Sequence, residues 1–220
     1  MKSFVKTVDD FGFNHQINSK IIKWFKTGKV DQIATVVNTT NFNEDYKMLT
    51  ETKVPTILHF NIVNGYPLSD PVNIPTLVDS KGKFWGIFFF WRLIRRKVSF
   101  KEIETELQAQ IQKIEEKNIN IIGFNSHYNV HLFTPIYQIV KKYFKPKQIR
   151  LWKTTKRNLW KNGKVRLFVF LILGLFVKIN KNGYQSKTEN IVHPFWFENK
   201  GSFCEIWKFF DKKSKSFNIR

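Results

Sequence analysis

Cysteine is nearly missing from this chain of 220 residues, in which Cys204 is the single thiol. One cysteine cannot form an intramolecular disulfide, so a buried core has to hold the fold, and such usage is typical of a reducing compartment. A chain of this length can bury that core without a disulfide or a structural metal. We therefore predict one domain over residues 1–220.

Long uncharged apolar runs are also missing. The longest extends from Leu167 to Val177, between Arg166 and Lys178, whereas spanning a bilayer takes roughly 20 apolar residues. This run therefore indicates a buried or interfacial helix. The first residues lead from Met1 directly into a strand pattern, without the apolar core of a signal peptide. Together these features predict a cytoplasmic protein with no transmembrane segment.

Acidic residues are scarce, because 17 Asp and Glu stand against 37 Lys and Arg, a net charge of +20. A basic surface attracts nucleic acid or anionic lipid. The block from Lys141 to Lys164 has no acid and contains Trp152 and Trp160, a combination found in single-strand binders. However, no RNA-binding signature, zinc knuckle or basic zipper accompanies the block. We therefore interpret its lysines as a solvated face and expect no nucleic-acid partner.

Short apolar runs alternate along the chain with helical patterns. The runs rich in Ile, Val, Leu and Phe are predicted strands, at residues 5–8, 33–37, 56–60, 119–124 and 148–152. Apolar residues at helical spacing from Ile17 to Phe25 predict a helix that ends before Gly28. A further helix is predicted over 135–143. This alternation favours an α/β fold with a mainly parallel sheet, either open or closed into a barrel.

Two serine–glutamate pairs have the spacing of a capping box, in which the two side chains satisfy the first backbone N–H groups of a helix. These are Ser99 with Glu102 and Ser202 with Glu205. After the first pair, apolar residues on one helical face predict a helix whose inner face consists of Ile103, Leu107, Ile111 and Ile114. The longest irregular stretch, residues 61–85, contains three prolines and is expected to form a loop beside a functional site.

Three predicted strand ends carry chemical groups. Asp9 and Asp10 follow the first strand, His59 ends the third, and His127 and His131 follow the fourth. Each group could also have a purely structural role. Acids are favourable at a helix N-terminus, and a lone histidine is usually a hydrogen-bonded core residue. His127 and His131 could share one ion at helical spacing, or one could bind while the other orients a partner. One carboxylate and two imidazoles at strand ends favour a hydrolytic metal site.

Four motifs resemble those of the YdjC-like carbohydrate deacetylases, and they occur in that family's order. They are VDDFGFNH (residues 8–15), LHF (58–60), GYPLS (65–69) and NSHYNVH (125–131). The resemblance extends from about Lys2 to Leu151 in one register. It implies a distorted, TIM-like (β/α) barrel, a divalent ion that is most often magnesium, and a homodimer. Zn²⁺ and Mn²⁺ are the alternatives that the same ligand types allow.

The resemblance also implies a role for individual residues. Asp10, His59 and His127 would bind the metal. Asp9 would be the general base for the attacking water, and His193 would protonate the departing amine. The substrate would be an acetylated amino sugar, such as an oligosaccharide or conjugate that contains N-acetylglucosamine.

Three further residues would support this site. His131 and Asn125 would lie behind the metal ligands and orient them. Arg150, at a predicted strand end, would contact the substrate.

The chain also departs from the family pattern. Asn125 replaces an aspartate, Asn129 replaces a histidine, and Phe195-Trp196 stands where a glycine is expected. Between residues 183 and 193 the resemblance implies that a strand and a helix are missing, so the barrel would be shortened near the C-terminus. Two hypotheses follow: an active metal-dependent N-deacetylase, or a degenerate, non-catalytic member that binds carbohydrate or an anionic partner.

Overall fold

The computed structural model describes residues 5–151, 184–185 and 191–192. The strands are β1 (Thr7–Phe11), β2 (Gln32–Thr35), β3 (Thr56–Phe60), β4 (Ile121–Ser126), β5 (Arg150–Leu151), β6 (Tyr184–Gln185) and β7 (Ile191–Val192). The helices are α1 (His15–Lys26), α2 (Thr40–Thr52), α3 (Phe88–Ile94), α4 (Phe100–Glu116) and α5 (Thr134–Val140). Three short 3₁₀ helices accompany them, η1 (Pro71–Asn73), η2 (His127–Leu132) and η3 (Pro146–Gln148).

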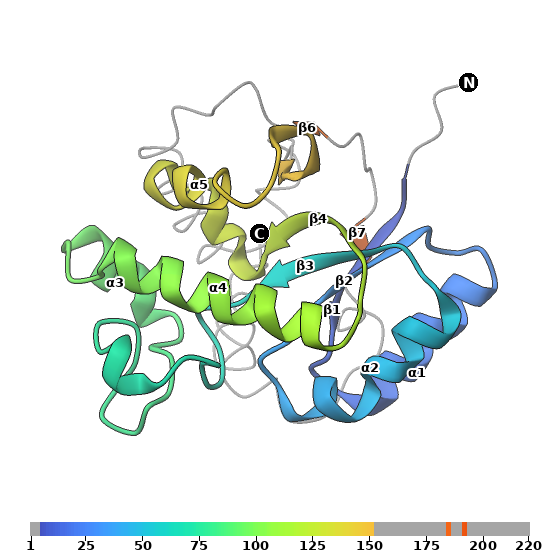
Figure 1. Cartoon of the computed structure of the whole chain (residues 1–220), viewed down its shortest axis with the longest axis horizontal. Coiled ribbons are helices and arrows are strands. Elements are labelled where there is room, and N and C mark those ends of the chain that lie inside the picture. Colours follow the sequence, from blue (N-terminus) through green and yellow to red (C-terminus); the bar gives the residue numbers. More distant parts are fainter. Residues whose placement is uncertain (1–4, 152–183, 186–190, 193–220) are drawn as a thin grey trace, which may run out of the picture.

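The main sheet has five strands in the order β4-β3-β2-β1-β7 (Figure 1), and every neighbouring pair is parallel. Strands β5 and β6 form a second parallel pair. The parallel sheet and the helices between its strands confirm the predicted α/β class. Because all the strands run the same way, residues at their carboxyl ends meet along one edge of the sheet.

Strands β1 and β3 are buried along their whole length, and β2 is buried except at Gln32, as is usual when helices cover both faces of a parallel sheet. Every residue of β3 is buried, and its bounds are those predicted. Helix α4 packs on β3 (Figure 1), while α1 and α2 lie beside one another. Ile103, Leu107 and Ile114 form the buried stripe of α4, so the helical spacing of apolar residues correctly identified its inner face.

Helix α1 confirms the prediction for its segment. The Asn14 side chain accepts hydrogen bonds from the backbone N–H groups of Gln16 and Ile17, which caps the first turn. The helix ends before Gly28, whose φ of 69° lies in the left-handed region that favours glycine. The helix predicted over 135–143 begins one residue earlier and ends at Val140.

The capping box predicted at Ser99 is wrong. Ser99 precedes α4 but makes no side-chain capping bond. The Glu102 carboxylate instead accepts two hydrogen bonds from Thr76, one from its backbone N–H and one from its hydroxyl, both at 2.7 Å. Glu102 therefore holds the long loop against α4 rather than closing the first turn. The second predicted capping box, at Ser202 and Glu205, lies outside the described residues.

The segment between β3 and α3 is largely irregular, as predicted. It contains η1 and one antiparallel bridge between Val78 and Phe84. Two backbone hydrogen bonds, from Phe84 N–H to the Gly65 carbonyl and from Gly86 N–H to the Val63 carbonyl, fold its end back on its beginning. This closure keeps the first residues of the loop beside the end of β3.

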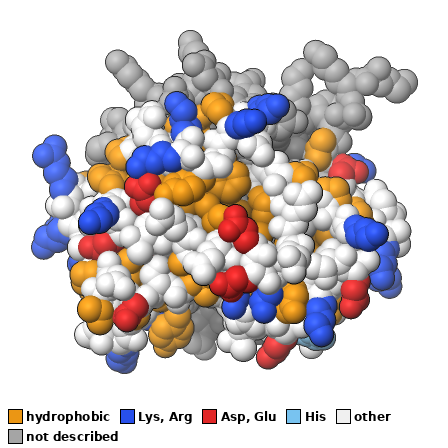
Figure 2. Space-filling view, in the orientation of Figure 1, with side chains coloured by type: hydrophobic (Ala, Val, Ile, Leu, Met, Phe, Trp, Pro, Cys, Tyr) orange, Lys and Arg blue, Asp and Glu red, His pale blue; other side chains and the backbone are white. Residues whose placement is uncertain are grey.

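Within the part of the chain that the structure describes, no helix is long and apolar enough to cross a membrane. The apolar run at 167–177 and most of the basic block at 141–164 lie outside the described residues. On the face shown in Figure 2, Lys and Arg side chains are dispersed around the edges, with Asp and Glu among them. The basic side chains of the described residues therefore form no continuous patch on that face.

Candidate metal centre

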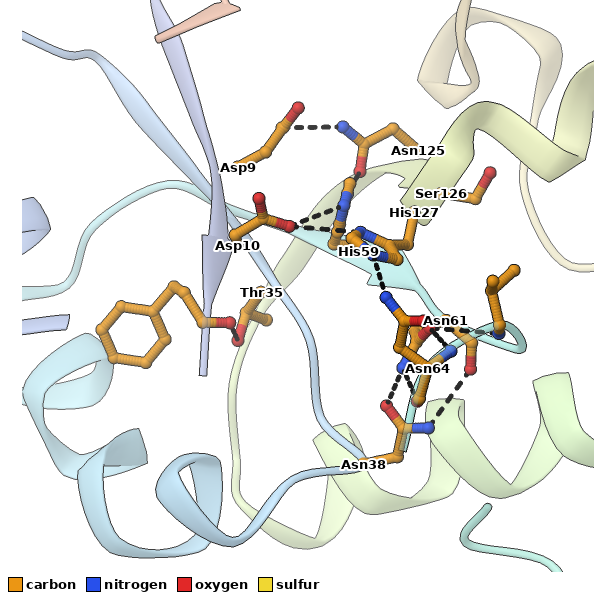
Figure 3. A network of polar contacts seen from close by, with 12 residues as sticks. Asp9, Asp10, Thr35, Asn38, His59, Asn61, Asn64, Asn125, Ser126 and His127 are labelled. Atoms are coloured by element: carbon orange, nitrogen blue, oxygen red, sulfur yellow. Dashed lines mark hydrogen bonds and ion pairs between the residues drawn. The ribbon is translucent and has the colours of Figure 1, made fainter. Parts of the chain in front are cut away.

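The backbone of β1 turns both aspartates toward the carboxyl edge of the sheet. Neighbouring residues on a regular strand face opposite sides, but Asp10 has φ of 71° and the pairing with β2 shifts register between Val8 and Phe11. Such a bulge re-aims side chains, and a left-handed aspartate is held only by the structure around it. As a result Asp9 and Asp10 both point toward the histidines and Asn125 (Figure 3).

The residue after β1 has to be glycine. Gly12 has φ of 109°, and a Cβ atom there would lie 2.2 Å from the carbonyl oxygen of Val36. Its backbone N–H donates to Oδ1 of Asn18 at 2.8 Å, which ties the turn to α1. The position of the Asp10 side chain therefore depends on a turn that no larger residue could form.

The structure brings together the three predicted metal ligands. Oδ1 of Asp10 lies 3.3 Å from Nε2 of His59 and 3.3 Å from Nδ1 of His127. The three donor atoms all lie within 4.8 Å of one another. Metal–ligand bonds of about 2.1 Å place neighbouring donor atoms about 3.0 to 3.4 Å apart, so the two separations from Asp10 fit a divalent ion shared with the histidines.

Two asparagines lie against the far sides of the imidazole rings. Nδ1 of His59 donates to Oδ1 of Asn125 at 2.6 Å, so the unprotonated Nε2 of a neutral ring faces Asp10. Nε2 of His127 lies 2.9 Å from Nδ2 of Asn64. Such partners fix the orientation of a ligand ring. Asn64 was not predicted, because a single asparagine in an irregular loop has no distinguishing pattern.

Asn64 is itself held by Asn61 (Figure 3), which belongs to a buried amide network that reaches α4. Asn61 accepts a hydrogen bond from the Asn64 backbone N–H at 3.1 Å and donates to its carbonyl at 2.8 Å. Gln110 of α4 donates to the Asn61 carbonyl at 2.7 Å and accepts from its N–H. The ring of His127 is therefore connected to the helix that packs on the sheet.

The field at this edge is negative, which favours a cation. Burial lowers the pKa of the His59 imidazole, but its hydrogen bond to Asp10, the nearby charge of Asp9 and the bond to Asn125 outweigh that effect. The pKa of His59 therefore lies above its ordinary value of 6.5. A bound metal ion would take the place of this proton, because histidine binds metals through an unprotonated nitrogen.

His131 lies outside the three-residue cluster. Its Nδ1 lies 2.5 Å from Oγ of Ser126, and its Nε2–H donates to the carbonyl of Arg150 at 2.8 Å. Within η2, Tyr128 and Asn129 have left-handed backbones that interrupt the helix, so the rings of His127 and His131 do not share one helical face. Burial lowers the pKa of His131 to about 4, which leaves a neutral ring that joins β4 to β5.

Asp9 lies beside the cluster with two buried partners. Nδ2 of Asn125 donates to its Oδ1 at 3.0 Å, and Nη1 of Arg150 lies 4.0 Å from the same oxygen. Arg150, expected to contact the substrate, is only 6% exposed. His193 lies outside the described residues, although the strand that precedes it, β7, pairs Val192 with Val8 of β1.

Comparison with known proteins identifies the family of this chain. The family model described as YdjC-like protein matches residues 5–211, so the chain belongs to the YdjC-like family. A carbohydrate deacetylase of Halalkalibacterium halodurans is 24% identical over 139 residues, which cover 63% of this chain and 58% of that protein. A chitooligosaccharide deacetylase of Yersinia pestis (strain Pestoides F) is 26% identical over 156 residues, which cover 68% of this chain and 58% of its own length.

Two further matches extend the comparison. A carbohydrate deacetylase of Danio rerio is 26% identical over 141 residues, 61% of this chain and 44% of that protein. The match thus spans about half of the length of these curated relatives. A crystal structure from Enterococcus faecalis V583, provisionally described as a cellobiose-phosphate cleavage protein, superimposes with a TM-score of 0.59 at 20% identity, covering 77% of this chain and 66% of the other. That similarity concerns the fold.

Proposed function

We propose that this protein is a metal-dependent hydrolase that removes the N-acetyl group from an acetylated amino sugar, such as an N-acetylglucosamine-containing oligosaccharide or conjugate. The observation that carries the proposal is the cluster of Asp10, His59 and His127, with a second carboxylate, Asp9, next to it. The names of the relatives, carbohydrate deacetylase and chitooligosaccharide deacetylase, support the choice of substrate class.

The ion would be divalent and held by Asp10, His59 and His127. One carboxylate oxygen and two imidazole nitrogens suit magnesium, manganese or zinc, and we favour magnesium because it is the ion most often associated with this family. When bound, such an ion supplies Lewis acidity toward an amide carbonyl and toward water.

The remaining chemistry belongs to side chains of this chain. Asp9 takes the proton of the attacking water, since its carboxylate lies beside the cluster without belonging to it. The Arg150 guanidinium lies 4.0 Å from the same carboxylate. His193 returns a proton to the departing amine, a task that suits the ordinary pKa of imidazole.

The proposal extends to the architecture. Residues 1–220 form one domain, a distorted TIM-like barrel shortened near the C-terminus, which functions in the cytoplasm as a homodimer. Of these features, the strand order bears on the barrel alone, because the parallel order β4-β3-β2-β1-β7 is compatible with part of a barrel wall.

A second function is favoured by specific residues. Asn125 and Asn129 stand where the family has charged or metal-binding side chains. A non-catalytic member that binds carbohydrate or an anionic partner would retain the ion site and the fold while lacking turnover.

Acetate release from diacetylchitobiose separates these functions. The full chain is assayed with Mg²⁺, Mn²⁺ or Zn²⁺ beside Asp10→Asn, which tolerates the left-handed backbone as aspartate does. We expect release by the parent protein and none above background by the variant. Equal release by both would exclude the assigned site. An ion that binds without acetate release from any acetylated sugar would favour the binding function.

A further inference from the structure

Asn125 connects two groups for which the proposed function has separate roles. It lies on β4 directly opposite His59 of β3 and is 5% exposed. Its Oδ1 lies 2.6 Å from Nδ1 of His59, and its Nδ2 lies 3.0 Å from Oδ1 of Asp9. One side chain therefore joins three strands at their carboxyl ends, and Figure 3 shows it between Asp9 and His59.

The donors and acceptors of these two hydrogen bonds follow from the chemistry of the groups. A carboxylate only accepts hydrogen bonds, so the amide must turn its NH₂ group toward Asp9. Its oxygen then faces His59, which must donate from Nδ1. A neutral His59 ring consequently has its lone pair on Nε2, the nitrogen 3.3 Å from Asp10. The orientation of Asp9 and the tautomer of His59 are thus determined by the same amide.

We propose that Asn125 is a positioning residue that aligns both His59 for the ion and Asp9 for proton transfer. This inference rests on the proposed function for the roles of those two residues. An aspartate at position 125 could also accept from His59, but it would place a second carboxylate where Asp9 now receives a donor. The amide of Asn125 serves both neighbours, whereas the aspartate of the family pattern could donate to Asp9 only in its protonated form.

Asn125→Asp separates the two tasks, because it keeps the acceptor for His59 and removes the donor to Asp9. We expect Mn²⁺ affinity, measured by calorimetry, to equal or exceed that of the parent protein. Turnover of diacetylchitobiose should fall about 10-fold, because Asp9 keeps its carboxylate but loses the donor that orients it, with KM little changed. Full turnover by this variant would overturn the alignment of Asp9.

Asn125→Ala removes both contacts, and we expect it to weaken Mn²⁺ binding by about 10- to 100-fold. Gln32→Ala is the matched control, because it removes an amide hydrogen bond to Thr7 at the opposite, amino-terminal edge of the sheet. It should leave Mn²⁺ affinity and turnover unchanged. Parent-like affinity in Asn125→Ala would overturn the role toward His59.

Nitrogen NMR of ¹⁵N-histidine-labelled protein tests the same inference without activity or metal. With His59→Gln as the assignment reference, the His59 ring should be protonated at Nδ1 in the parent and in Asn125→Asp. In Asn125→Ala the two tautomers should mix. If the parent binds no ion, the proposed function fails, whereas a His59 tautomer unaffected by Asn125→Ala contradicts the role of Asn125 itself.

Discussion

Asp10 and Glu106 are both buried acids, 5% and 0% exposed, but their oxygens meet different partners. Glu106 accepts hydrogen bonds from the backbone N–H groups of Leu68 and Ser69, at 3.1 and 2.9 Å, and from the amide of Gln110 at 2.8 Å. Asp10 faces two imidazole nitrogens at 3.3 Å each. Backbone N–H groups have no lone pair to offer a cation, whereas imidazole nitrogens have one.

Glu106 therefore holds a loop in place, whereas Asp10 faces side chains that can bind a metal ion together with it. Burial raises the pKa of Glu106, and the hydrogen bonds from Gln110, Ser69 and Leu68 oppose that rise. Asp10, in contrast, has a left-handed backbone and lies beside a second carboxylate, Asp9. Both features lower the stability of the folded chain. Changes at the two sites should therefore affect different measurements.

The largest effect on stability is expected from Glu106→Ala. The substitution leaves two buried backbone donors and the Gln110 amide without their acceptor, which should lower the free energy of unfolding by about 4 kcal/mol. Urea unfolding measures this loss. The folded fraction should still bind one Mn²⁺ per chain, and a lower stoichiometry would mean that Glu106 also serves the ion site.

Acid should weaken the fold through His131. Its pKa in the folded protein is about 4, below the ordinary value of 6.5, so the unfolded chain gains a proton first as the pH falls. The contribution of His131 to the free energy of unfolding is fully present above pH 6.5, and about 3 kcal/mol of it is lost between pH 6.5 and 4.

Urea unfolding of the parent and His131→Gln across this pH range measures the contribution of His131. The variant should be less stable at pH 7 and show a flatter pH dependence. Parallel pH curves for the two proteins would contradict the assignment.

Metal should stabilise the parent but not Asp10→Asn. At a free Mn²⁺ concentration 100 times the dissociation constant, the unfolding free energy should increase by about 2.7 kcal/mol. The variant should show no increase, because one of the three donor groups has lost its charge. Thermal unfolding with and without Mn²⁺ provides the measurement, and equal stabilisation of both proteins would argue against this centre.

The smallest effect should come from Glu104→Gln, at a carboxylate near the surface. Lys142 lies 2.8 Å away and the Tyr143 hydroxyl 2.9 Å away, and both lower the pKa of Glu104 below its ordinary 4.5. The contribution of these two contacts to the free energy of unfolding is present above pH 4.5, and it is lost as the pH falls through the lowered pKa of Glu104. Because the pair is solvated, the substitution should cost less than about 1 kcal/mol at pH 7 by urea unfolding, and little in 1 M salt. A larger loss of unfolding free energy would mean that Glu104 interacts with Lys142 and Tyr143 more strongly than a solvated pair does.

Much of the fold could be predicted from apolar spacing alone. The strand at 56–60 and the inner face of α4 follow from local pattern, because their residues are buried by the elements that they form. Helix α2 was not predicted, since its buried residues include Asp45 between Phe42 and Leu49. Asp45 is compensated by hydrogen bonds from Asn18 and His15, which are distant in the sequence.

The candidate site was predictable in its ligand types but not in its geometry. Three chemical groups at strand ends indicated the cluster, because parallel strands bring those ends together. The left-handed backbone of Asp10, the bulge in β1 and the amide of Asn64 depend on tertiary contacts that local sequence does not encode. The same limit left the relation between His127 and His131 open until the two left-handed residues between them were seen.

The order of the strands has a consequence for how the protein is made. Asn125 and Asp9 are in contact across 116 positions of sequence, and β1 to β4 lie side by side in the order in which they are synthesised. A ribosome therefore releases Asp10 and His59 well before His127 exists to complete their cluster. An ion could therefore bind to all three residues of the cluster only late in synthesis, after the fourth strand has joined the first three.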